Sequence, residues 1–350
     1  MAGVYAVIMA GGRGERFWPL STDEIPKPFV PLLGSKSLIQ DTAARLEPWI
    51  ARDRLFVSIG EAQVPVARRQ LPQIPADNFI IEPVGRDTCA CIGYCALHLE
   101  RIDPEAVMLA LPADHFVGDN GAFRRTMEKG LRNLEGAAGI VFGIVPTRPE
   151  TGYGYIQAEK PALSAEAWPV VRFVEKPDAA RAEQYCKTGS FFWNSGMFIW
   201  SNRNLLRLFE THMPATWEGL NRLRPLLGKS DSAGERLRVF SGLERISIDF
   251  GIMEKTSGLR MVPAEFPWDD IGNWASLERA LPADAGGNVS RGPFSGLDSD
   301  GCITYSDAGG VAAFGISNLV VVQAHGNVLV CPKDRAWDLK RLAAELLKKG

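Results

Sequence analysis

Short apolar runs alternate with longer amphipathic stretches through the first half of the chain. The runs predict strands, and the stretches between them have helical spacing, as over Leu38 to Leu46 and Thr88 to Leu99. The predicted strands are Val4 to Ala10, Leu55 to Gly60, Phe79 to Glu82, Val107 to Leu111 and Gly139 to Val145. This alternation is typical of an α/β fold with a doubly wound, mostly parallel, Rossmann-like sheet. Such sheets bind ligands beyond the carboxyl ends of their strands, so we expect the chemistry in the segments that follow the strands.

The pattern changes in the second half of the chain. After about residue 150, short strand-like runs mix with aromatic clusters, and a segment rich in Gly, Asp and Ser extends from Pro282 to Gly310. We therefore predict a large domain over residues 1–285 and a small one over residues 286–350 that ends in a helix. We expect the apolar face of this terminal helix to dock onto the core. That face carries Trp337, Leu342, Leu346 and Leu347.

Composition and charge narrow the possible classes of function. The 350 residues include 39 Lys and Arg against 41 Asp and Glu. The net charge is therefore close to zero, and no overall electrostatic field favours binding to nucleic acid or to a membrane surface. The apolar run Val4 to Ala10 is too short to span a bilayer, and we interpret it as a buried strand rather than a signal peptide. Six cysteines without a CxxC pair favour reduced thiols in a cytoplasmic protein. The three that cluster, Cys89, Cys91 and Cys95, are interpreted as small core residues rather than metal ligands.

A glycine-rich segment follows the first predicted strand. Residues 10–21 read AGGRGERFWPLS, and the tripeptide PKP follows at residues 26–28. The glycines let backbone N–H groups approach a phosphate chain, while Arg16 and Lys27 supply positive charge, so we predict a phosphate cradle. Phe17 stands where a dinucleotide fingerprint needs a third glycine, and the chain has no GxxxxGK[ST] P-loop. These features argue against an NAD-binding dehydrogenase.

The glycine-rich segment resembles the signature of the sugar nucleotidylyltransferases, a GGxGxRLxPL turn followed by PKP or PKQ. Further segments resemble the mannose-1-phosphate guanylyltransferase branch in the family's order: EPVGRDT (82–88), LPADH (111–115), ETGYGYI (150–156), FVEKP (173–177), WNSGMF (193–198), SID (247–249) with IMEK (252–255), and WDDIGNW (268–274). The resemblance implies a nucleotidyltransferase-type sheet followed by a small left-handed β-helix-like domain, which is often used in dimer contacts, and hence a homodimer. Because the sequence stops near residue 350, we expect no cupin-like isomerase domain of the kind that longer bifunctional relatives carry.

The resemblance also implies a reaction and roles for individual residues. The expected reaction is transfer of GMP from GTP to α-D-mannose 1-phosphate by direct in-line attack, giving GDP-mannose and pyrophosphate. Asp114 and Asp270 are expected to hold Mg²⁺, which prefers oxygen ligands. Lys176 is expected to bind the sugar phosphate, while Arg16 and Lys27 stabilise the triphosphate and the pyrophosphate leaving group. The other expected ligands are Gly154, Glu175 and Asn194 for the sugar, and Ala10, Gly11, Gly12, Gly14, Glu82, Arg86 and Asp87 for the nucleotide.

The contacts to guanine stay open, and several positions depart from the family pattern. A carboxylate suits the N–H donors of guanine, and Glu82, Asp87 and backbone carbonyls are all candidates. Glu15 stands where Thr or Ser is usual, Asp87 where Asn is expected, and Ala90 where Pro is frequent, while HGN at residues 325–327 replaces an expected Thr-x-Asp. An acidic Glu15 is unfavourable beside a triphosphate unless it faces solvent or the metal. We interpret His115 as a supporting or packing residue, because an ionised sugar phosphate needs no strong base.

Two alternatives remain. One is a related transferase for another sugar 1-phosphate or another nucleotide, since epimeric sugars differ only in the placement of one hydroxyl. The other is a non-catalytic, nucleotide-binding regulatory subunit with the same fold. The presence of the full charged set argues against a regulatory subunit; this set is Arg16, Lys27, Asp114, Lys176 and Asp270.

Overall fold

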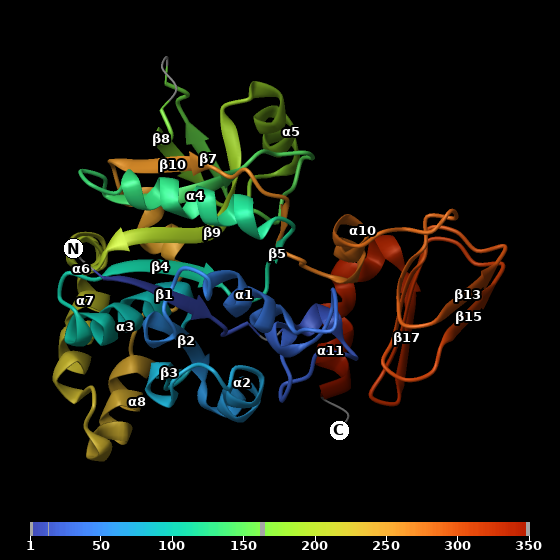
Figure 1. The fold of residues 1–350 in the computed structure, drawn as a ribbon, viewed down its shortest axis with the longest axis horizontal. Helices are drawn as coiled ribbons and strands as arrows, with labels where there is room; N and C mark the ends of the chain where they lie inside the picture. Colours follow the sequence, from blue (N-terminus) through green and yellow to red (C-terminus); the bar gives the residue numbers. More distant parts are fainter. Residues whose placement is uncertain (1–2, 13, 162–164, 348–350) are drawn as a thin grey trace.

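The computed structural model describes residues 3–12, 14–161 and 165–347, apart from the side chain of Leu347, so Arg13 of the predicted cradle lies outside the described residues (Figure 1). Within these ranges, nine strands form one sheet in the order β3-β2-β1-β4-β9-β6-β10-β8-β7. They are β1 (Val4–Met9), β2 (Leu55–Gly60), β3 (Phe79–Glu82), β4 (Val107–Pro112), β6 (Gly139–Ile144), β7 (Tyr155–Ala158), β8 (Trp168–Val174), β9 (Phe191–Ser201) and β10 (Leu259–Pro263). The strands predicted from the apolar runs are therefore present, with bounds that differ by one or two residues at most.

The two halves of this sheet differ in strand direction. β1 pairs in parallel with β2 and β4, and β2 pairs in parallel with β3. Beyond β4, the strand β9 runs antiparallel to both β4 and β6, and β8 runs antiparallel to β7 and β10, while β6 and β10 are parallel. β7 also pairs with β9, so this second half curls back on itself. The parallel half is the part that the alternating pattern predicted.

Helices cover both faces of the sheet (Figure 1). Side chains alternate along β1, so that Tyr5 and Val7 enter a core shared with α3, α6, α7 and α8, while Ala6 and Ile8 enter a second core shared with α1, α2 and α4. These two cores make the doubly wound α/β arrangement that the sequence predicted. The helices are α1 (Leu38–Leu46), α2 (Val64–Gln70), α3 (Asp87–Ile102), α4 (Asn120–Arg132), α5 (Ala179–Thr188), α6 (Asn202–His212), α7 (Pro214–Leu223), α8 (Ala233–Ser241), α9 (Ile248–Gly251), α10 (Leu277–Ala280) and α11 (Leu339–Leu347). The clustered cysteines of α3 lie in the first core.

The C-terminal region forms short stacked strands that project from the large domain (Figure 1). β12, β14 and β16 stack in parallel, β13 and β15 form a second parallel pair, and β17 closes the first stack in antiparallel fashion. Repeated parallel stacking of successive chain segments is a β-helix-like arrangement, as predicted. The strands are β12 (Val289–Arg291), β13 (Phe294–Leu297), β14 (Ile303–Ser306), β15 (Val311–Phe314), β16 (Leu319–Ala324) and β17 (Asn327–Pro332).

The prediction for the terminal helix was wrong about which side chains dock. Trp337 lies in a 3₁₀ turn (Lys333–Asp338) before α11, and Trp337, Leu342 and Leu346 are 45%, 40% and 37% exposed. The side chain of Leu347 lies outside the described part. The buried side chains are those of Ala336, Leu339 and Ala343, which are three and four residues apart and therefore share a face. Leu339 and the two alanines therefore dock, whereas Leu342 and Leu346 face away from the core. No helix in the described ranges is both long and apolar enough to cross a membrane.

Candidate active site

The site forms where two strands of the large sheet end and two distant segments pair. In the pairing of β1 with β4, Met9 lies opposite Pro112, so the glycine-rich segment and the Asp114 turn leave the sheet at the same edge. The short strand β5 (Phe116–Val117) follows that turn and pairs antiparallel with β11 (Trp268–Asp269). This pairing brings Asp270, which follows β11, to the same edge.

These segments surround a hollow of about 690 Å³. A volume of this size is within the usual range for pockets that bind small ligands. Seven of the predicted site residues line it: Gly11, Gly14, Arg16, Lys27, Asp87, Asp114 and Asp270. Two cationic residues that the sequence did not single out, Arg245 and Lys340, also line it. The hollow therefore combines cations and a glycine-rich backbone, which suit phosphate groups, with carboxylates that suit a metal ion.

Lys27 lies at the centre of the polar contacts in this hollow. Its side chain is 8% exposed, and its ammonium nitrogen lies 2.8 Å from Asp114 Oδ2 and donates to the backbone oxygen of Asp270 at 2.7 Å. The close approach of the glycine-rich segment to this lysine requires Gly14, whose φ is 68°. A Cβ at position 14 would lie 2.2 Å from the Lys27 Cβ, so any other residue would displace the loop.

The charge of Lys27 determines the protonation of its partner. Burial alone would raise the pKa of Asp114, but the Lys27 ammonium, the neighbouring His115 and hydrogen bonds to the carboxylate together hold this pKa below its ordinary value. Burial lowers the pKa of His115, although the neighbouring Asp114 carboxylate opposes this effect. The His115 Nδ1 accepts a hydrogen bond from Trp268 Nε1 at 3.2 Å, so the imidazole is fixed against the indole beside Asp114.

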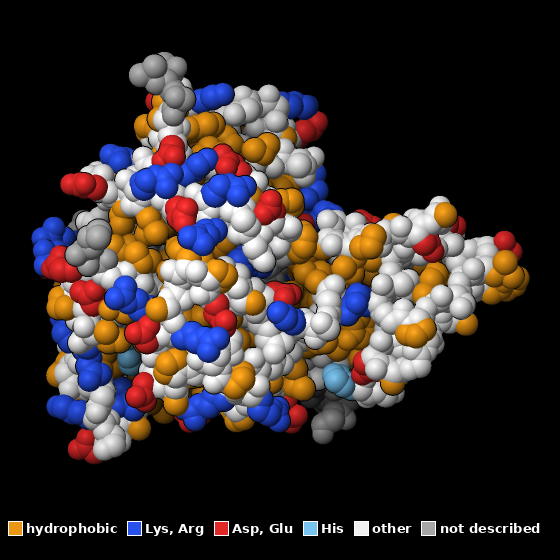
Figure 2. Space-filling view, viewed as in Figure 1, with side chains coloured by type: hydrophobic (Ala, Val, Ile, Leu, Met, Phe, Trp, Pro, Cys, Tyr) orange, Lys and Arg blue, Asp and Glu red, His pale blue; other side chains and the backbone are white. Residues whose placement is uncertain are grey.

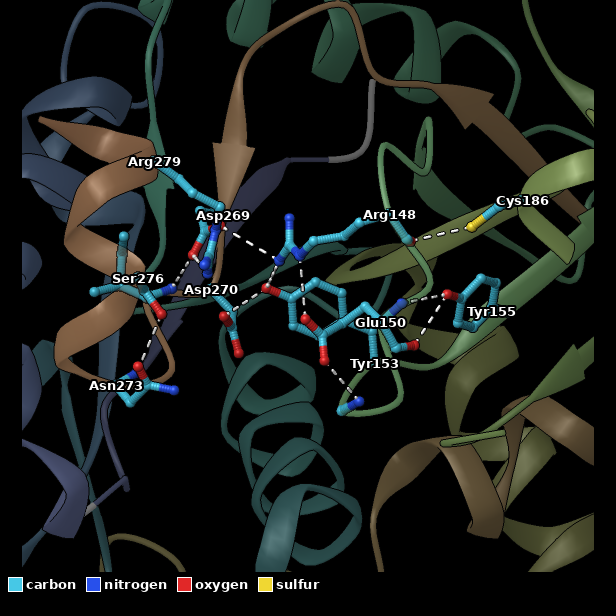
Figure 3. Close-up of polar contacts among 12 residues, drawn as sticks. Arg148, Glu150, Tyr153, Tyr155, Cys186, Asp269, Asp270, Asn273, Ser276 and Arg279 are labelled. Atoms are coloured by element: carbon cyan, nitrogen blue, oxygen red, sulfur yellow. Dashed lines mark hydrogen bonds and ion pairs between the residues drawn. The ribbon is translucent and has the colours of Figure 1, made fainter. Parts of the chain in front are cut away.

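A second polar network fixes Asp270 (Figure 3). The Tyr153 hydroxyl donates to Asp270 Oδ1 at 2.7 Å and accepts from Arg148 Nη2 at 3.3 Å. The preceding carboxylate, Asp269, is held by Arg279 through two hydrogen bonds of 2.5 and 3.0 Å. Burial and the nearby Asp270 charge raise the pKa of Tyr153, which keeps its hydroxyl protonated and able to donate. Tyr153 therefore orients the Asp270 carboxylate, while the two arginines hold Tyr153 and Asp269 beside it.

The sequence reasoning missed Tyr153, Arg148 and Arg279. Tyr153 lies inside the TGYGY segment, directly before the predicted sugar ligand Gly154, and this position in the sequence could have identified it as a site residue. Arg148 and Arg279 carry no motif of their own, and only the folded chain brings them to Asp269 and Tyr153.

The predicted sugar ligands lie together on neighbouring strands. In the pairings of β7 with β8 and β9, Gly154 precedes β7, Glu175 follows β8, and Asn194 lies within β9. The backbone N–H of Asn194 donates to the Gly154 carbonyl at 2.8 Å. A Cβ at position 154 would lie 2.4 Å from Glu175 Oε2, which explains the glycine. Lys176 pairs with Glu175 at 2.9 Å and has a left-handed backbone, with φ of 45°. Such conformations are strained for a side chain other than glycine and concentrate at functional sites.

Asp249 is an additional acidic residue beside these predicted sugar ligands, and we call this part of the site the predicted sugar region. Its Oδ1 accepts from Asn194 Nδ2 at 2.8 Å. Burial, together with the nearby Glu175 carboxylate, raises the pKa of Asp249 to about 7. Because Tyr153 contacts Asp270 and Gly154 lies against Glu175, the predicted sugar region directly adjoins the hollow. The two regions are joined through the Tyr153-Gly154 step.

The remaining predicted nucleotide ligands have different positions. Asp87 lines the hollow and has a φ of 66°, a conformation that Asp and Asn adopt more easily than most residues. Glu82 is buried behind Gly11, where it accepts from Ser58 Oγ at 2.9 Å, and burial raises its pKa. Arg86 donates to the backbone oxygen of Ser241 and is not among the described residues that line the hollow.

Two nucleotide candidates belong to the glycine-rich segment itself. Ala10 is buried, and its N–H donates to the Ser58 carbonyl at 2.9 Å. Gly12 is exposed, and a Cβ at this position would meet no described atom within 4 Å. The nucleotide-binding roles of Ala10, Gly12, Glu82 and Arg86 therefore stay predictions.

Comparisons with known proteins agree across almost the whole chain. Residues 5–286 match the nucleotidyl transferase family, and residues 294–346 match the MannoseP isomerase/GMP-like beta-helix domain. The chain is 36% identical to the mannose-1-phosphate guanylyltransferase of Klebsiella pneumoniae, over 98% of this chain and 74% of the relative. It is 35% identical to the xanthan biosynthesis protein XanB of Xanthomonas campestris, over 100% of this chain and 74% of the relative.

A solved structure is similar to this fold along its full length. It is named a mannose-1-phosphate geranyltransferase and comes from Thermus thermophilus. It superimposes with a TM-score of 0.90 at 40% sequence identity and covers 98% of this chain and 99% of its own. The similarity therefore includes the C-terminal strands as well as the large sheet.

Proposed function

This chain belongs to the nucleotidyl transferase family, and we propose that it transfers GMP from GTP to α-D-mannose 1-phosphate, giving GDP-mannose and pyrophosphate. The observation that carries this proposal is the position of Lys27, whose ammonium contacts both Asp114 and the Asp270 turn beside the predicted sugar region. A cation at this junction is placed to neutralise charge that two phosphate groups bring together. The relatives named mannose-1-phosphate guanylyltransferase support the choice of substrates.

In the proposed mechanism, a phosphate oxygen of the sugar phosphate attacks the α-phosphorus of GTP in line with the departing pyrophosphate. Both substrates are already ionised near neutral pH, so the protein has to position them and offset their charge. Arg16 and Lys27 would contact the triphosphate and the leaving pyrophosphate. Lys176 would hold the sugar phosphate, which approaches from the predicted sugar region. His115 is not required as a base, and its lowered pKa fits a neutral supporting role.

Asp114 and Asp270 are the proposed ligands of Mg²⁺. Both line the hollow and offer the hard oxygen donors that Mg²⁺ prefers, and Tyr153 already orients Asp270. In the described part of the chain, no group of three or more His, Cys, Asp or Glu residues is arranged to hold a metal ion. Two carboxylates would therefore leave the other coordination positions to phosphate oxygens and water. When bound there, Mg²⁺ supplies positive charge that offsets the charge of the phosphate oxygens.

The remaining contacts follow the arrangement of the strands. We assign the sugar hydroxyls to Glu175 and Asn194, with Gly154 giving room for the ring. The glycine-rich segment, from Ala10 through Gly14, would receive the phosphates. Guanine is assigned to the loop that includes Glu82, Arg86 and Asp87. Asp87 is favoured within that loop because it lines the hollow, whereas Glu82 is buried behind Gly11.

The assembly and location of the protein form part of the same proposal. Hydrophobic side chains are exposed on the projecting C-terminal region (Figure 2). On β17, Val328 and Val330 are 65% and 58% exposed, and on α11, Leu342 and Leu346 are 40% and 37% exposed. Exposed apolar side chains mark interaction surfaces when they gather in one region, and we propose that those of the C-terminal region form a homodimer interface. The large domain would end near residue 285, between α10 and β12. Free thiols on all six cysteines fit a reducing, cytoplasmic location.

The proposed function is tested by measuring pyrophosphate release with Mg²⁺ for GTP, ATP, UTP and dTTP, each with mannose 1-phosphate or glucose 1-phosphate. An Asp114→Ala preparation controls for contaminating activity. Release confined largely to GTP with mannose 1-phosphate would support the proposal. Preference for another pair of substrates would support the proposed type of reaction but would replace the proposed nucleotide or sugar phosphate. If GTP binds but no pair releases pyrophosphate, the regulatory-subunit alternative replaces the proposal.

A further inference from the structure

The C-terminal region shares a core with the loops of the active site. In this core, Phe17 of the glycine-rich segment and Trp274 of the Asp270 turn pack with buried side chains of the C-terminal strands and with Leu339 of α11. The Phe17 and Trp274 rings meet edge to face with centroids 5.2 Å apart. α11 stands between the large domain and the projecting strands (Figure 1). The terminal helix is therefore placed to act on the phosphate-binding loop.

Trp337 contacts three segments of the active site at once. The Arg16 guanidinium carbon lies 4.8 Å from the centroid of the indole ring. The ring also lies against Gly272 and Gly152, where a Cβ would be 3.2 Å and 3.7 Å from Trp337 Cη2. Arg16 Nη1 donates to the Gly272 carbonyl at 2.9 Å. Arg16 is thus held by a carbonyl and an aromatic ring before any phosphate binds.

Lys340 approaches the same loop from the next turn of α11. It lines the hollow, and its ammonium lies 3.7 Å from Glu15 Oε2. Glu15 is the acidic residue that stands beside the predicted phosphate site. A carboxylate there repels a triphosphate, and a cation within a few ångströms reduces that repulsion.

We propose that the C-terminal domain completes the nucleotide site through two side chains. Trp337 is a positioning residue that holds the Arg16 guanidinium toward the hollow, and Lys340 offsets the charge of Glu15. Holding Arg16 before binding reduces the conformational entropy that it loses when it contacts a phosphate. The cation–π contact orients the guanidinium without consuming its N–H donors. This inference rests on the proposed binding of GTP in the hollow.

The role of Trp337 is tested with Trp337→Ala and Trp337→Phe. Phe314→Ala is the control, because Phe314 is an exposed aromatic residue of the same domain that lies on β15. Calorimetry with GTP should show affinity reduced about tenfold in Trp337→Ala and largely kept in Trp337→Phe. The KM for mannose 1-phosphate should stay within about twofold of the wild-type value, since the sugar ligands do not contact Trp337. Equal losses for both substrates, or GTP affinity unchanged in Trp337→Ala, would overturn this role.

The role of Lys340 is tested by a double-mutant cycle with Glu15. Lys340→Met should weaken GTP binding about fivefold at low salt, as expected for an exposed charge pair. Adding Glu15→Gln should restore affinity to within about twofold of the wild-type value, because the repelling charge is then absent. Arg341→Met is the control: it removes a cation from the neighbouring position of the same helix, and it should leave the affinity for GTP nearly unchanged.

The possible results of this cycle distinguish a failure of the proposed Lys340 role from a failure of the proposed GTP-binding function. A double variant as weak as Lys340→Met would show that Lys340 does not act through Glu15 and would overturn this role. The same loss in Arg341→Met would also overturn it, since that would be a general effect of charge. Wild-type protein that fails to bind GTP would instead contradict the proposed function.

Discussion

The Tyr153 hydroxyl should set the affinity of the proposed Mg²⁺ site, because it orients the proposed ligand Asp270. It donates to Asp270 Oδ1 at 2.7 Å in a buried position, and replacing Tyr153 by Phe removes only that hydroxyl. The ring would keep its edge-to-face contacts with Trp193 and Trp268, whose centroids lie 5.2 and 5.3 Å away. The expected defect is therefore a loss of orientation at Asp270 rather than a loss of packing.

The size of the effect follows from the type of hydrogen bond. A hydrogen bond to a charged group contributes about 1.5–3 kcal/mol. Loss of a partner that orients a metal ligand typically weakens metal affinity or activity by about 10- to 100-fold. We therefore expect Tyr153→Phe to raise the Mg²⁺ concentration for half-maximal turnover at least about tenfold. The maximal rate at saturating Mg²⁺ should fall much less, because excess metal compensates for the weaker site.

A Mg²⁺ titration of pyrophosphate release measures this effect, and electron paramagnetic resonance of Mn²⁺ in the presence of GTP measures binding without turnover. Tyr155→Phe is the matched control, since the Tyr155 hydroxyl donates to the Glu150 carbonyl at 2.9 Å and does not contact Asp270 (Figure 3). A half-saturating Mg²⁺ concentration for Tyr153→Phe within about twofold of the wild-type value would refute the reasoning. So would an equal change in both variants.

Three further predictions concern the metal, the sugar phosphate and pH. Asp114→Ala or Asp270→Ala should abolish turnover with the circular dichroism spectrum unchanged; near-normal activity in either would contradict the metal assignment. Lys176→Ala should raise the KM for mannose 1-phosphate about tenfold through loss of a charged contact, whereas Lys187→Ala, in an exposed pair on α5, should not. Because the pKa of Asp249 is raised from 3.8 to about 7, its protonated form stabilises the fold, and this contribution is lost as pH rises through about 7. The melting temperature of Asp249→Asn should therefore exceed that of the wild type by a margin that grows as pH rises from about 4 to 8. A constant difference in melting temperature would contradict this.

Local patterns in the sequence predicted the parallel half of the sheet well. Each of its strands is a continuous apolar run, and both of its faces are covered by helices, so the pattern does not depend on which strand pairs with which. The same reasoning placed Asp114 at a strand end. The hollow that contains both Asp114 and Asp270 could be expected only through the family resemblance, because the pairing of β5 with β11 has no local signature.

Other features could not be predicted because they depend on contacts between distant segments. The hydrogen bond between Tyr153 and Asp270 joins residues 117 positions apart. The docking face of the terminal helical segment was assigned to Trp337, Leu342, Leu346 and Leu347, but the structure buries Ala336, Leu339 and Ala343 and exposes Leu342 and Leu346. Apolar periodicity indicates that a helix has an apolar face, but it does not indicate whether that face packs against the core or remains exposed at the surface. Glu15 looked unfavourable in the sequence because its partner, Lys340, lies near the other end of the chain.

The central claim is a single in-line displacement at the α-phosphorus of GTP. The most direct test is the stereochemical course of the reaction with one diastereomer of GTP that carries sulfur on the α-phosphorus. The account predicts inversion of configuration in the GDP-mannose product, because one displacement inverts the phosphorus centre once. Retention would indicate two displacements through a covalent intermediate and would contradict the account.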